Sequence, residues 1–305
     1  MKKIKGHAKK RSGQWELQAM VWPAILLMLL FNFLPMFGLI IAFQDYSPMA
    51  GFSDSLFVGL ANFKAFLTDK DFYNVLLNTF GISALKLLIG FPLEIILALM
   101  LNELRPGKFK KFSQTVSYLP HFLSWVILGG MMGAWLGSSG LLNNILMSLN
   151  IIDAPISFLG DASNYWLVAT LSDIWKEVGW GTILYLAAIS GINPGLYEAA
   201  KMDGAKKLEQ IWHITLPGIK DIVILMFVLR IGSLFGSNLD QALVLQNPSN
   251  LMRSEIIDSY VYHLGMAQGD FSFATAVGIF SSIVAVTLLV IANVCTKKYN
   301  DSSIF

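Results

Sequence analysis

Six ionisable side chains lie inside long apolar stretches of the sequence, where they are the residues best placed to bind a polar solute. They are Lys86, Glu94, Asp173, Lys176, Glu177 and Arg230. A charge within a membrane costs about 2.5–3.5 kcal/mol on insertion scales, so such side chains usually face protein or water. Asp173 and Glu177 are four residues apart and would share one face of a helix, with Trp175 between them in the chain. The set favours a polar passage for a solute, a network of internal ion pairs such as Arg230 with Glu177, or a proton relay.

Enzymatic chemistry has no comparable support in the sequence. The P-loop pattern GxxxxGK[ST] is absent, and the four histidines show no HxxxH or HExxH spacing. The single cysteine, Cys295, excludes an internal disulfide and a cysteine-based metal site. No nucleophile and base are discernible at one depth of an apolar stretch, which disfavours an intramembrane enzyme. A net charge of only +2 also gives no basic surface for nucleic acid. We therefore expect no catalytic residue, no metal site and no cofactor bound by this chain.

The elements that position these charges are predicted to be membrane-spanning helices. Hydrophobic residues make up 55% of the 305 residues and charged residues only 14%, with a mean hydropathy of +0.59. Six stretches reach the roughly 20 mostly apolar residues that a spanning helix needs. They are 20–43, 73–101, 112–137, 163–190, 219–237 and 272–296. The sequence therefore predicts an all-α, polytopic membrane bundle with six transmembrane helices.

The distribution of Lys and Arg predicts the orientation of this bundle. Sixteen of them fall in the two tails and in the loops 102–111 and 191–220, whereas the alternate loops contain three. We therefore expect a protein of the cell membrane with both termini in the cytoplasm. Cytoplasmic tails at 1–19 and 297–305 would flank a transmembrane domain at 20–296. The outer loops are long enough to contact a protein or ligand, or simply to cover the bundle.

The predicted cytoplasmic segment 191–218 combines helix-favouring residues with a central glycine. Helical residues follow Pro194, Gly204 interrupts them, and helical spacing resumes from 205 to 214. Small side chains near the glycine permit close approach by a partner, and two carboxylates can pair with its basic groups. These residues are Ala199, Ala200, Glu198 and Asp203. The segment is either a docking element for a soluble protein or an amphipathic helix that rests on the bilayer.

The order of residues in this segment resembles the coupling loop, or EAA loop, of the membrane subunits of binding-protein-dependent ABC importers. The matching residues are Glu198-Ala199-Ala200, Gly204 and Ile214-Thr215-Leu216-Pro217. The resemblance covers nearly the whole chain and looks closest to maltose-type carbohydrate-uptake permeases, in particular their complex-polysaccharide branch. Further stretches that carry it are Asn78-Thr79, 86–103, 117–120, 173–179 and 260–262. Glu94 departs from the pattern, which would have an apolar residue or proline there.

This resemblance implies the fold of a type I ABC importer permease with no enzymatic activity of its own. It implies a heterodimer with a second homologous permease, two ATP-binding subunits that hold ATP and Mg, and an extracellular solute-binding protein. An oligosaccharide or polysaccharide-derived glycan is the implied substrate, and the six ionisable residues and Trp175 are expected along its pathway. Contacts with the ATPase are implied for the loop residues that match the motif. They are Glu198, Ala199, Ala200, Asp203, Gly204, Ala205, Leu216 and Pro217.

The sequence leaves two questions open: the type of transporter and the role of the aromatic residues in the spans. A secondary transporter driven by an ion gradient is the alternative function, although no inverted repeat is visible. The residues that would suit it are Lys86, Glu94, Asp173 and Lys176. Aromatic side chains in the spans could stack on sugar rings, but such residues more often pack or lie at the membrane interface. They are Trp125, Trp135, Tyr165, Trp175, Trp180 and Tyr185.

Overall fold

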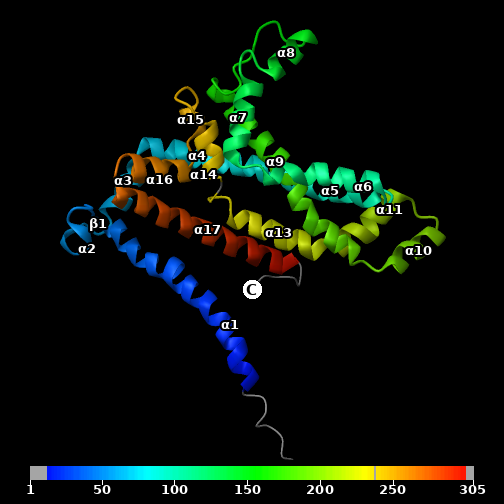
Figure 1. Cartoon of the computed structure of the whole chain (residues 1–305), viewed down its shortest axis with the longest axis horizontal. Coiled ribbons are helices and arrows are strands. Elements are labelled where there is room, and N and C mark those ends of the chain that lie inside the picture. Colours follow the sequence, from blue (N-terminus) through cyan, green and yellow to red (C-terminus); the bar gives the residue numbers. More distant parts are fainter. Residues whose placement is uncertain (1–11, 237, 300–305) are drawn as a thin grey trace, which may run out of the picture.

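The computed structural model describes residues 12–236 and 238–299, and helices dominate it (Figure 1). The first part contains α1 (Ser12–Met28), η1 (Leu29–Phe33), η2 (Leu34–Phe43), β1 (Gln44–Asp45), α2 (Gly51–Asp54), β2 (Leu56–Phe57) and α3 (Ala61–Thr68). The middle part contains α4 (Lys70–Leu85), η3 (Lys86–Gly90), α5 (Phe91–Glu103), α6 (Lys108–Tyr118), η4 (Leu119–Phe122), α7 (Trp125–Leu136), α8 (Leu141–Ser148), η5 (Ala162–Asn164) and α9 (Tyr165–Ser190). The last part contains α10 (Pro194–Met202), α11 (Lys207–Gln210), η6 (Ile211–Thr215), α12 (Leu216–Gly218), α13 (Lys220–Gly232), α14 (Leu239–Leu245), α15 (Leu251–Ser254), α16 (Ile257–Tyr262), η7 (His263–Ala267) and α17 (Phe271–Tyr299). The strands β1 and β2 form one short antiparallel pair.

Four helical segments within the described residues are long and apolar enough to span a membrane. They are Gln18–Phe43, Lys70–Glu103, Trp125–Ser148 and Phe271–Lys297. The first, second and fourth agree closely with predicted spans. The predicted spans at 163–190 and 219–237 correspond to α9, which carries three charges within two turns, and to α13, which has 13 residues. Neither α9 nor α13 therefore stands out as a span by length and composition alone.

The predicted span at 112–137 is not one continuous helix, so that expectation was wrong. Helix α6 ends at Tyr118, η4 follows, and α7 begins only at Trp125. Pro120 lacks an N–H group and so weakens the helix, and the two residues before α7 have extended backbone. The Ser124 hydroxyl then accepts a hydrogen bond from the Ile127 N–H at 3.3 Å and caps α7. The proline and the capping serine are the physical reason for the break.

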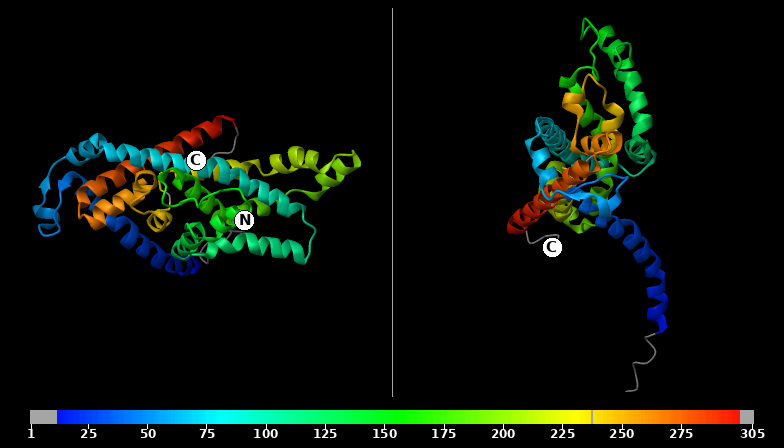
Figure 2. Two further views of the ribbon diagram at one scale, coloured as in Figure 1. Left: turned by 90° about the horizontal axis from the view of Figure 1, so that it is seen from above. Right: turned by 90° about the vertical axis from the view of Figure 1, so that its left-hand side faces the viewer.

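The helices α5, α6, α9, α13 and α17 lie side by side and form the body of the molecule (Figures 1 and 2). The segment from α10 to α11 extends from one end of this body, whereas β1, α2, α3 and α15 lie toward the other end. Helix α1 leans away from the body on one side, and α7 and α8 project from it on the other. In Gln18–Phe43, no residue of the most apolar stretch is buried by the rest of the chain. This long apolar surface is available to lipid or to another membrane protein.

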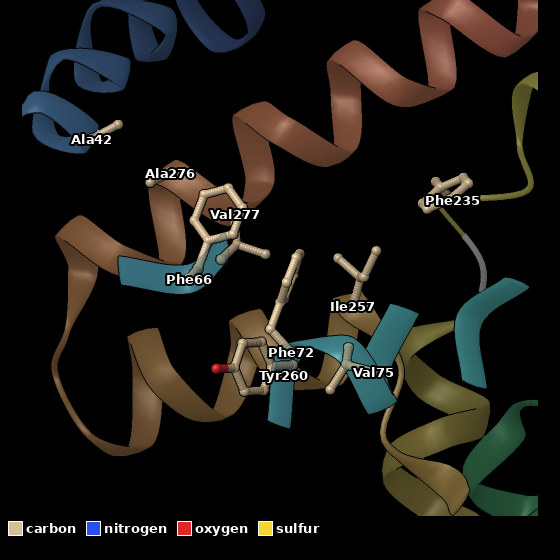
Figure 3. Packing of buried hydrophobic residues seen from close by; sticks show 9 residues of the cluster. All are labelled: Ala42, Phe66, Phe72, Val75, Phe235, Ile257, Tyr260, Ala276 and Val277. Carbon is tan, nitrogen blue, oxygen red and sulfur yellow. The ribbon is translucent and has the colours of Figure 1, made fainter. Parts of the chain in front are cut away.

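Buried apolar side chains form three clusters along the body. The first joins α3, α4, α16 and α17, with Phe66 and Phe72 at a ring-centroid distance of 4.8 Å and Val277 beside them (Figure 3). At its edge, the Tyr260 hydroxyl donates a hydrogen bond to Asp69, and burial together with this bond raises the pKa of Tyr260. The second cluster contains Ile82, and the third contains Phe91. The charged segment around Lys86 therefore lies between two apolar clusters that hold α4 and α5 against α9.

Close approach of helices depends on two particular glycines. A Cβ atom on Gly179 of α9 would collide with the backbone of Ser117 in α6, so only glycine permits this crossing. A Cβ atom on Gly129 of α7 would collide with the Val244 side chain of α14. The next glycine of the GxxxG series in α7, Gly133, has open space around it instead. Close packing within the chain therefore involves Gly129 but not Gly133.

Candidate functional site: a polar cavity and a protruding helical segment

A polar cavity of about 360 Å³ lies where α4 and η3 meet α9 and the chain that leaves α13. Its lining residues are Ser83, Lys86, Leu87, Asp173, Glu177, Arg230, Ser233, Leu234, Gly236 and Asn238. Four of the six charged residues that interrupt the apolar stretches thus meet at one cavity, although they come from three separate parts of the chain. The remaining two, Glu94 and Lys176, lie behind its wall as ion-pair partners.

Lys86 and Asp173 form a buried ion pair on this wall. The Lys86 Nζ atom lies 3.1 Å from Asp173 Oδ1 and also donates a hydrogen bond to Gln241 at 2.6 Å. The side chains of Lys86 and Asp173 are only 11% and 10% exposed. The Asn238 amide donates a second hydrogen bond to Asp173 at 2.5 Å. These additional hydrogen bonds compensate the desolvation of both charges, which a bare buried ion pair does not achieve.

Arg230 pairs with Glu94, not with Glu177 as one sequence interpretation suggested. The Glu94 side chain is 4% exposed and does not line the cavity, whereas the Arg230 side chain is 36% exposed. Arg230 therefore lines the cavity while its counter-charge lies behind the wall. Gly181 of α9 leaves room for this pair, because a Cβ atom there would collide with the Glu94 carboxylate.

Glu177 is held by two partners that do not line the cavity. Its Oε1 atom accepts a hydrogen bond from Lys176 at 2.9 Å, and its Oε2 atom lies 2.7 Å from His121 Nδ1. Lys176 also donates to the His121 carbonyl oxygen at 2.7 Å. Its Nζ atom lies 5.7 Å from the centroid of the Trp125 ring. The cavity wall thus presents Glu177 with its positive partner behind it, the reverse of the Arg230 arrangement.

The sequence interpretation and the geometry differ at several positions. Trp175 is not a lining residue, since it lies on another face of α9 with 42% of its surface exposed. Asn238, Gln241 and His121 belong to the charge network but were not singled out as site residues. No local sequence pattern identifies them, because Gln241 is 155 residues from its partner Lys86. No group of three or more His, Cys, Asp or Glu residues among those described could hold a metal ion.

The segment at the far end of the body has the helix–glycine–helix form that its sequence predicts. The Asn193 side chain caps α10 by accepting a hydrogen bond from the Gly195 N–H at 2.9 Å. Helix α10 ends at Met202, and Gly204 reverses the chain with a φ of +81°, a conformation that favours glycine. In the second half, the Glu209 carboxylate accepts a hydrogen bond from the Lys206 N–H at 2.6 Å and so begins α11.

Contacts within the chain join the two halves of this segment to each other and to the body. The hydroxyl groups of Tyr197 and Thr215 lie 3.0 Å apart, and the Gln210 amide donates to the Ala205 carbonyl oxygen at 2.9 Å. The Lys207 Nζ atom lies 2.6 Å from the Glu103 carboxylate at the end of α5. The segment therefore projects from the body as a connected unit.

The residues predicted to contact an ATPase lie mainly on the outer surface of this segment. Glu198, Ala199, Asp203, Gly204 and Pro217 are exposed, whereas Ala200, Ala205 and Leu216 are partly buried. Apolar side chains accompany them on the surface. They are Met202, Leu208 and Trp212, which are 88%, 70% and 67% exposed. Exposed apolar side chains beside charged ones are typical of a protein–protein or membrane interaction site.

Membrane-length apolar helices, a cavity lined by polar side chains and a projecting helical segment fit a membrane transport subunit. The chain belongs to the family described as "Binding-protein-dependent transport system inner membrane component", whose model matches residues 90–297. Its relatives in this family are permease subunits of ABC transporters, so the chain is a non-catalytic permease subunit. Membership of this family argues against the hypothesis of an intramembrane enzyme. It also favours an ABC importer over a secondary transporter driven by an ion gradient.

Individual relatives match over almost the whole chain. The polygalacturonan/rhamnogalacturonan transport system permease protein YteP of Bacillus subtilis is 43% identical over 290 residues, which cover 95% of this chain and 90% of that protein. Protein LplB of the same organism is 41% identical over 305 residues, which cover 100% of this chain and 95% of that protein. A chain of a bacterial alginate ABC transporter, solved in complex with a periplasmic protein bound to alginate pentasaccharide, is 35% identical with a TM-score of 0.88. That match covers 97% of this chain and 99% of the solved chain. The fold is therefore that of an ABC importer permease.

Proposed function

We propose that this permease moves an oligosaccharide or polysaccharide-derived glycan, delivered by an extracellular solute-binding protein, across the cell membrane. The polar cavity carries this proposal, because it offers hydrogen-bond donors and acceptors within an otherwise apolar body. A sugar loses many hydrogen bonds to water on entering a membrane and needs such groups in exchange. The names of the relatives support a glycan, since YteP and the solved alginate transporter are described with polysaccharide substrates.

We propose six membrane spans, with α9 and α13 added to the four apolar segments and both termini in the cytoplasm. The charges of α9 have partners within the chain, as Asp173 has in Lys86 and Glu177 in Lys176. A paired charge that faces protein is compatible with a membrane helix. The excess of Lys and Arg in the tails and in two loops supports the orientation.

We propose that the segment from α10 to α12 is the coupling element, docked on one of two separate ATPase subunits that bind ATP and Mg. A second homologous permease would complete the transmembrane part. Closure of the ATPase subunits would then move this segment, and the Lys207–Glu103 and Tyr197–Thr215 contacts would pass the movement to α5 and η6. The cavity would switch between access from the inside and access from the outside as the two permeases move.

The proposed docking is tested at Gly204, where a Cβ atom would have no neighbour within 4 Å in this chain. Gly204→Arg is expected to give a membrane-inserted protein that no longer co-purifies with the ATPase and shows no ATP-dependent uptake. Gly269→Arg is the matched control, because Gly269 has a similar φ of +77° and equally open surroundings in the outer loop. It is expected to retain the ATPase in affinity purification followed by mass spectrometry.

Normal ATPase recovery and uptake with Gly204→Arg would contradict the docking model. Purification of the wild-type chain without an ATPase or a second permease, together with uptake in the absence of ATP, would instead support the secondary transporter.

A further inference from the structure

One face of α6 is apolar and exposed over its whole length. Phe109, Phe112 and Val116 follow one another at intervals of three and four residues, so they form one stripe along the helix. They are 67%, 65% and 51% exposed. Leu119, the first residue of η4, continues this apolar stripe and is also exposed. Lipid or another protein must cover such a surface in a membrane subunit.

The other side of α6 packs against the body and so fixes the direction of the apolar stripe. Ser113 and Ser117 lie one turn apart on this side and are partly buried. The Ser117 backbone comes so close to Gly179 of α9 that a Cβ atom on the glycine would collide with it. The apolar stripe therefore points outward, away from the helices that lie beside α6 (Figure 1).

A basic cluster lies at the start of the same helix. It consists of Arg105, Lys108, Lys110 and Lys111. Three of these residues are exposed and Lys110 is partly buried, and none of the four forms an ion pair with another residue that the structure describes. The nearest carboxylate in the sequence, Glu103, is paired with Lys207 at 2.6 Å, and the next one along the chain is Asp153. The counter-charge of the basic cluster must therefore come from outside this part of the chain.

The basic cluster lies where a membrane segment ends. The apolar segment Lys70–Glu103 stops just before it, so the start of α6 is expected at the level of the lipid headgroups. Lys108 and Lys111 are three residues apart on one side of the apolar stripe. Long basic side chains at such a level extend their charged ends toward water and phosphate while their methylene groups stay on apolar surface. The helix thus joins phosphate-binding groups to a surface for acyl chains.

We propose that the start of α6 is a binding site for an anionic phospholipid, with Lys108 and Lys111 on the headgroup phosphate and the apolar stripe under the acyl chains. A soluble partner does not fit the whole surface, because the stripe continues past Val116 to the level of Gly179, in the middle of the proposed span α9. A second permease could cover the stripe but would not explain the unpaired basic cluster. Basic residues beside a membrane attract anionic lipid by about 1 kcal/mol each.

The position of this site links it to the proposed coupling segment. Glu103, at the end of α5, contacts Lys207 of α11, and Ser117 of α6 contacts α9, which leads directly into α10. A bound phospholipid would hold the turn between α5 and α6 at the membrane surface while the segment from α10 to α12 moves. The lipid site itself depends neither on the glycan substrate nor on the direction of transport.

The test uses photoreactive phosphatidylglycerol and photoreactive phosphatidylcholine, each with the reactive group on an acyl chain. The importer is purified through a tag on this chain, with the subunits that accompany it, and placed in nanodiscs whose two leaflets have the same composition. Mass spectrometry then measures the labelling of residues 105–119. Phosphatidylglycerol is expected to label this segment more strongly, and unlabelled phosphatidylglycerol, but not phosphatidylcholine, should compete. High salt should lower the difference between the two lipids, because it screens exposed charges.

A pair of double variants assigns the effect to the basic cluster. Lys108→Gln with Lys111→Gln is expected to lower the ratio of phosphatidylglycerol to phosphatidylcholine labelling about fivefold for each lysine, the equivalent of about 1 kcal/mol. Lys64→Gln with Lys70→Gln is the matched control, since it removes the same charge from two exposed lysines of α3 and α4. It is expected to keep the wild-type ratio.

Equal labelling of the wild-type segment by the two lipids would overturn the anionic site and leave α6 as a helix that only faces lipid. If neither lipid labels residues 105–119, a protein covers the apolar stripe and the proposal is wrong. A fall of the same size in the control variant would overturn it as well, because the effect would then follow the net charge of the chain. None of these results bears on the proposed glycan substrate.

Discussion

The polar cavity and the proposed coupling segment, α10 to α12, both present charged residues, but their charges have different partners. In the cavity, Lys86 and Arg230 are paired with carboxylates of the same chain, and amide side chains complete the network. In the coupling segment, Glu198 and Asp203 are exposed and form no ion pair with the residues that the structure describes. The cavity is therefore organised by the chain itself, whereas these two carboxylates of the proposed coupling segment remain accessible to a partner. Substitutions should accordingly reduce stability in the first region and assembly in the second.

Loss of the Lys86 charge is expected to have the largest effect on stability. Lys86→Met leaves Asp173 without its cation at a site where its side chain is 10% exposed. Removal of one member of a buried ion pair typically costs about 3–5 kcal/mol. The midpoint of thermal unfolding of the detergent-solubilised protein should fall strongly, and Lys86→Met with Asp173→Asn should recover much of the loss. If Lys86→Met unfolds at the wild-type temperature, the cavity is not held together by this pair.

The Arg230–Glu94 pair should show an asymmetric effect. Arg230→Leu leaves the Glu94 carboxyl without its cation at 4% exposure and is expected to cost about 3 kcal/mol, near the lower end for buried pairs. Glu94→Leu should cost less, because the Arg230 side chain is 36% exposed and can still reach water in the cavity. Thermal unfolding of both single variants and of the double variant measures this difference. Equal losses of stability in Arg230→Leu and Glu94→Leu would mean that Arg230 does not reach water in the cavity.

The Lys207–Glu103 pair is expected to have the smallest effect, since both side chains are substantially exposed at 65% and 37%. Lys207→Gln should lower the free energy of unfolding by about 0.2–1 kcal/mol, as for other surface ion pairs. Its effect should disappear in 1 M salt, where the screening length falls to about 3 Å. The Lys86→Met effect should persist there, because buried charges are screened much less. If the effect of Lys207→Gln persists in 1 M salt, the Lys207–Glu103 pair behaves like the buried ion pairs of the cavity and not like a surface pair.

The sequence predicted those parts of the fold that depend on local pattern. Apolar stretches located three spans closely, and Gly204 with its flanking residues predicted two short helices that meet at a turn. The break at η4 also had a local signal, Pro120 followed by the capping Ser124, which the length of the apolar stretch obscured. Helix α9 also follows the predicted stretch 163–190, but the partners that neutralise its charges are set only in three dimensions.

The partners within the site could not be predicted in the same way. Each charged residue was identifiable because it interrupts an apolar stretch, but its partner depends on which helices meet. Arg230 lies 136 residues from Glu94, and Asn238 lies 65 residues from Asp173. One sequence pattern gives no information on contacts at such separations. The stacking of His121 on Trp180 also arises only when η4 folds against α9.

The ion pairs of α9 and α13 also bear on how the protein enters the membrane during its synthesis. In the proposed six-span arrangement, Lys86 is synthesised 87 residues before Asp173, and Glu94 is synthesised 136 residues before Arg230. Lys86 and Glu94 should therefore stay near water or lipid headgroups until the helices that carry their partners have been synthesised. Helices α9 and α13 are too polar or too short to partition into lipid readily by themselves. We expect their insertion to depend on the charged partners made before them, Lys86 for α9 and Glu94 for α13, so the order of synthesis is part of what makes this sequence a membrane protein.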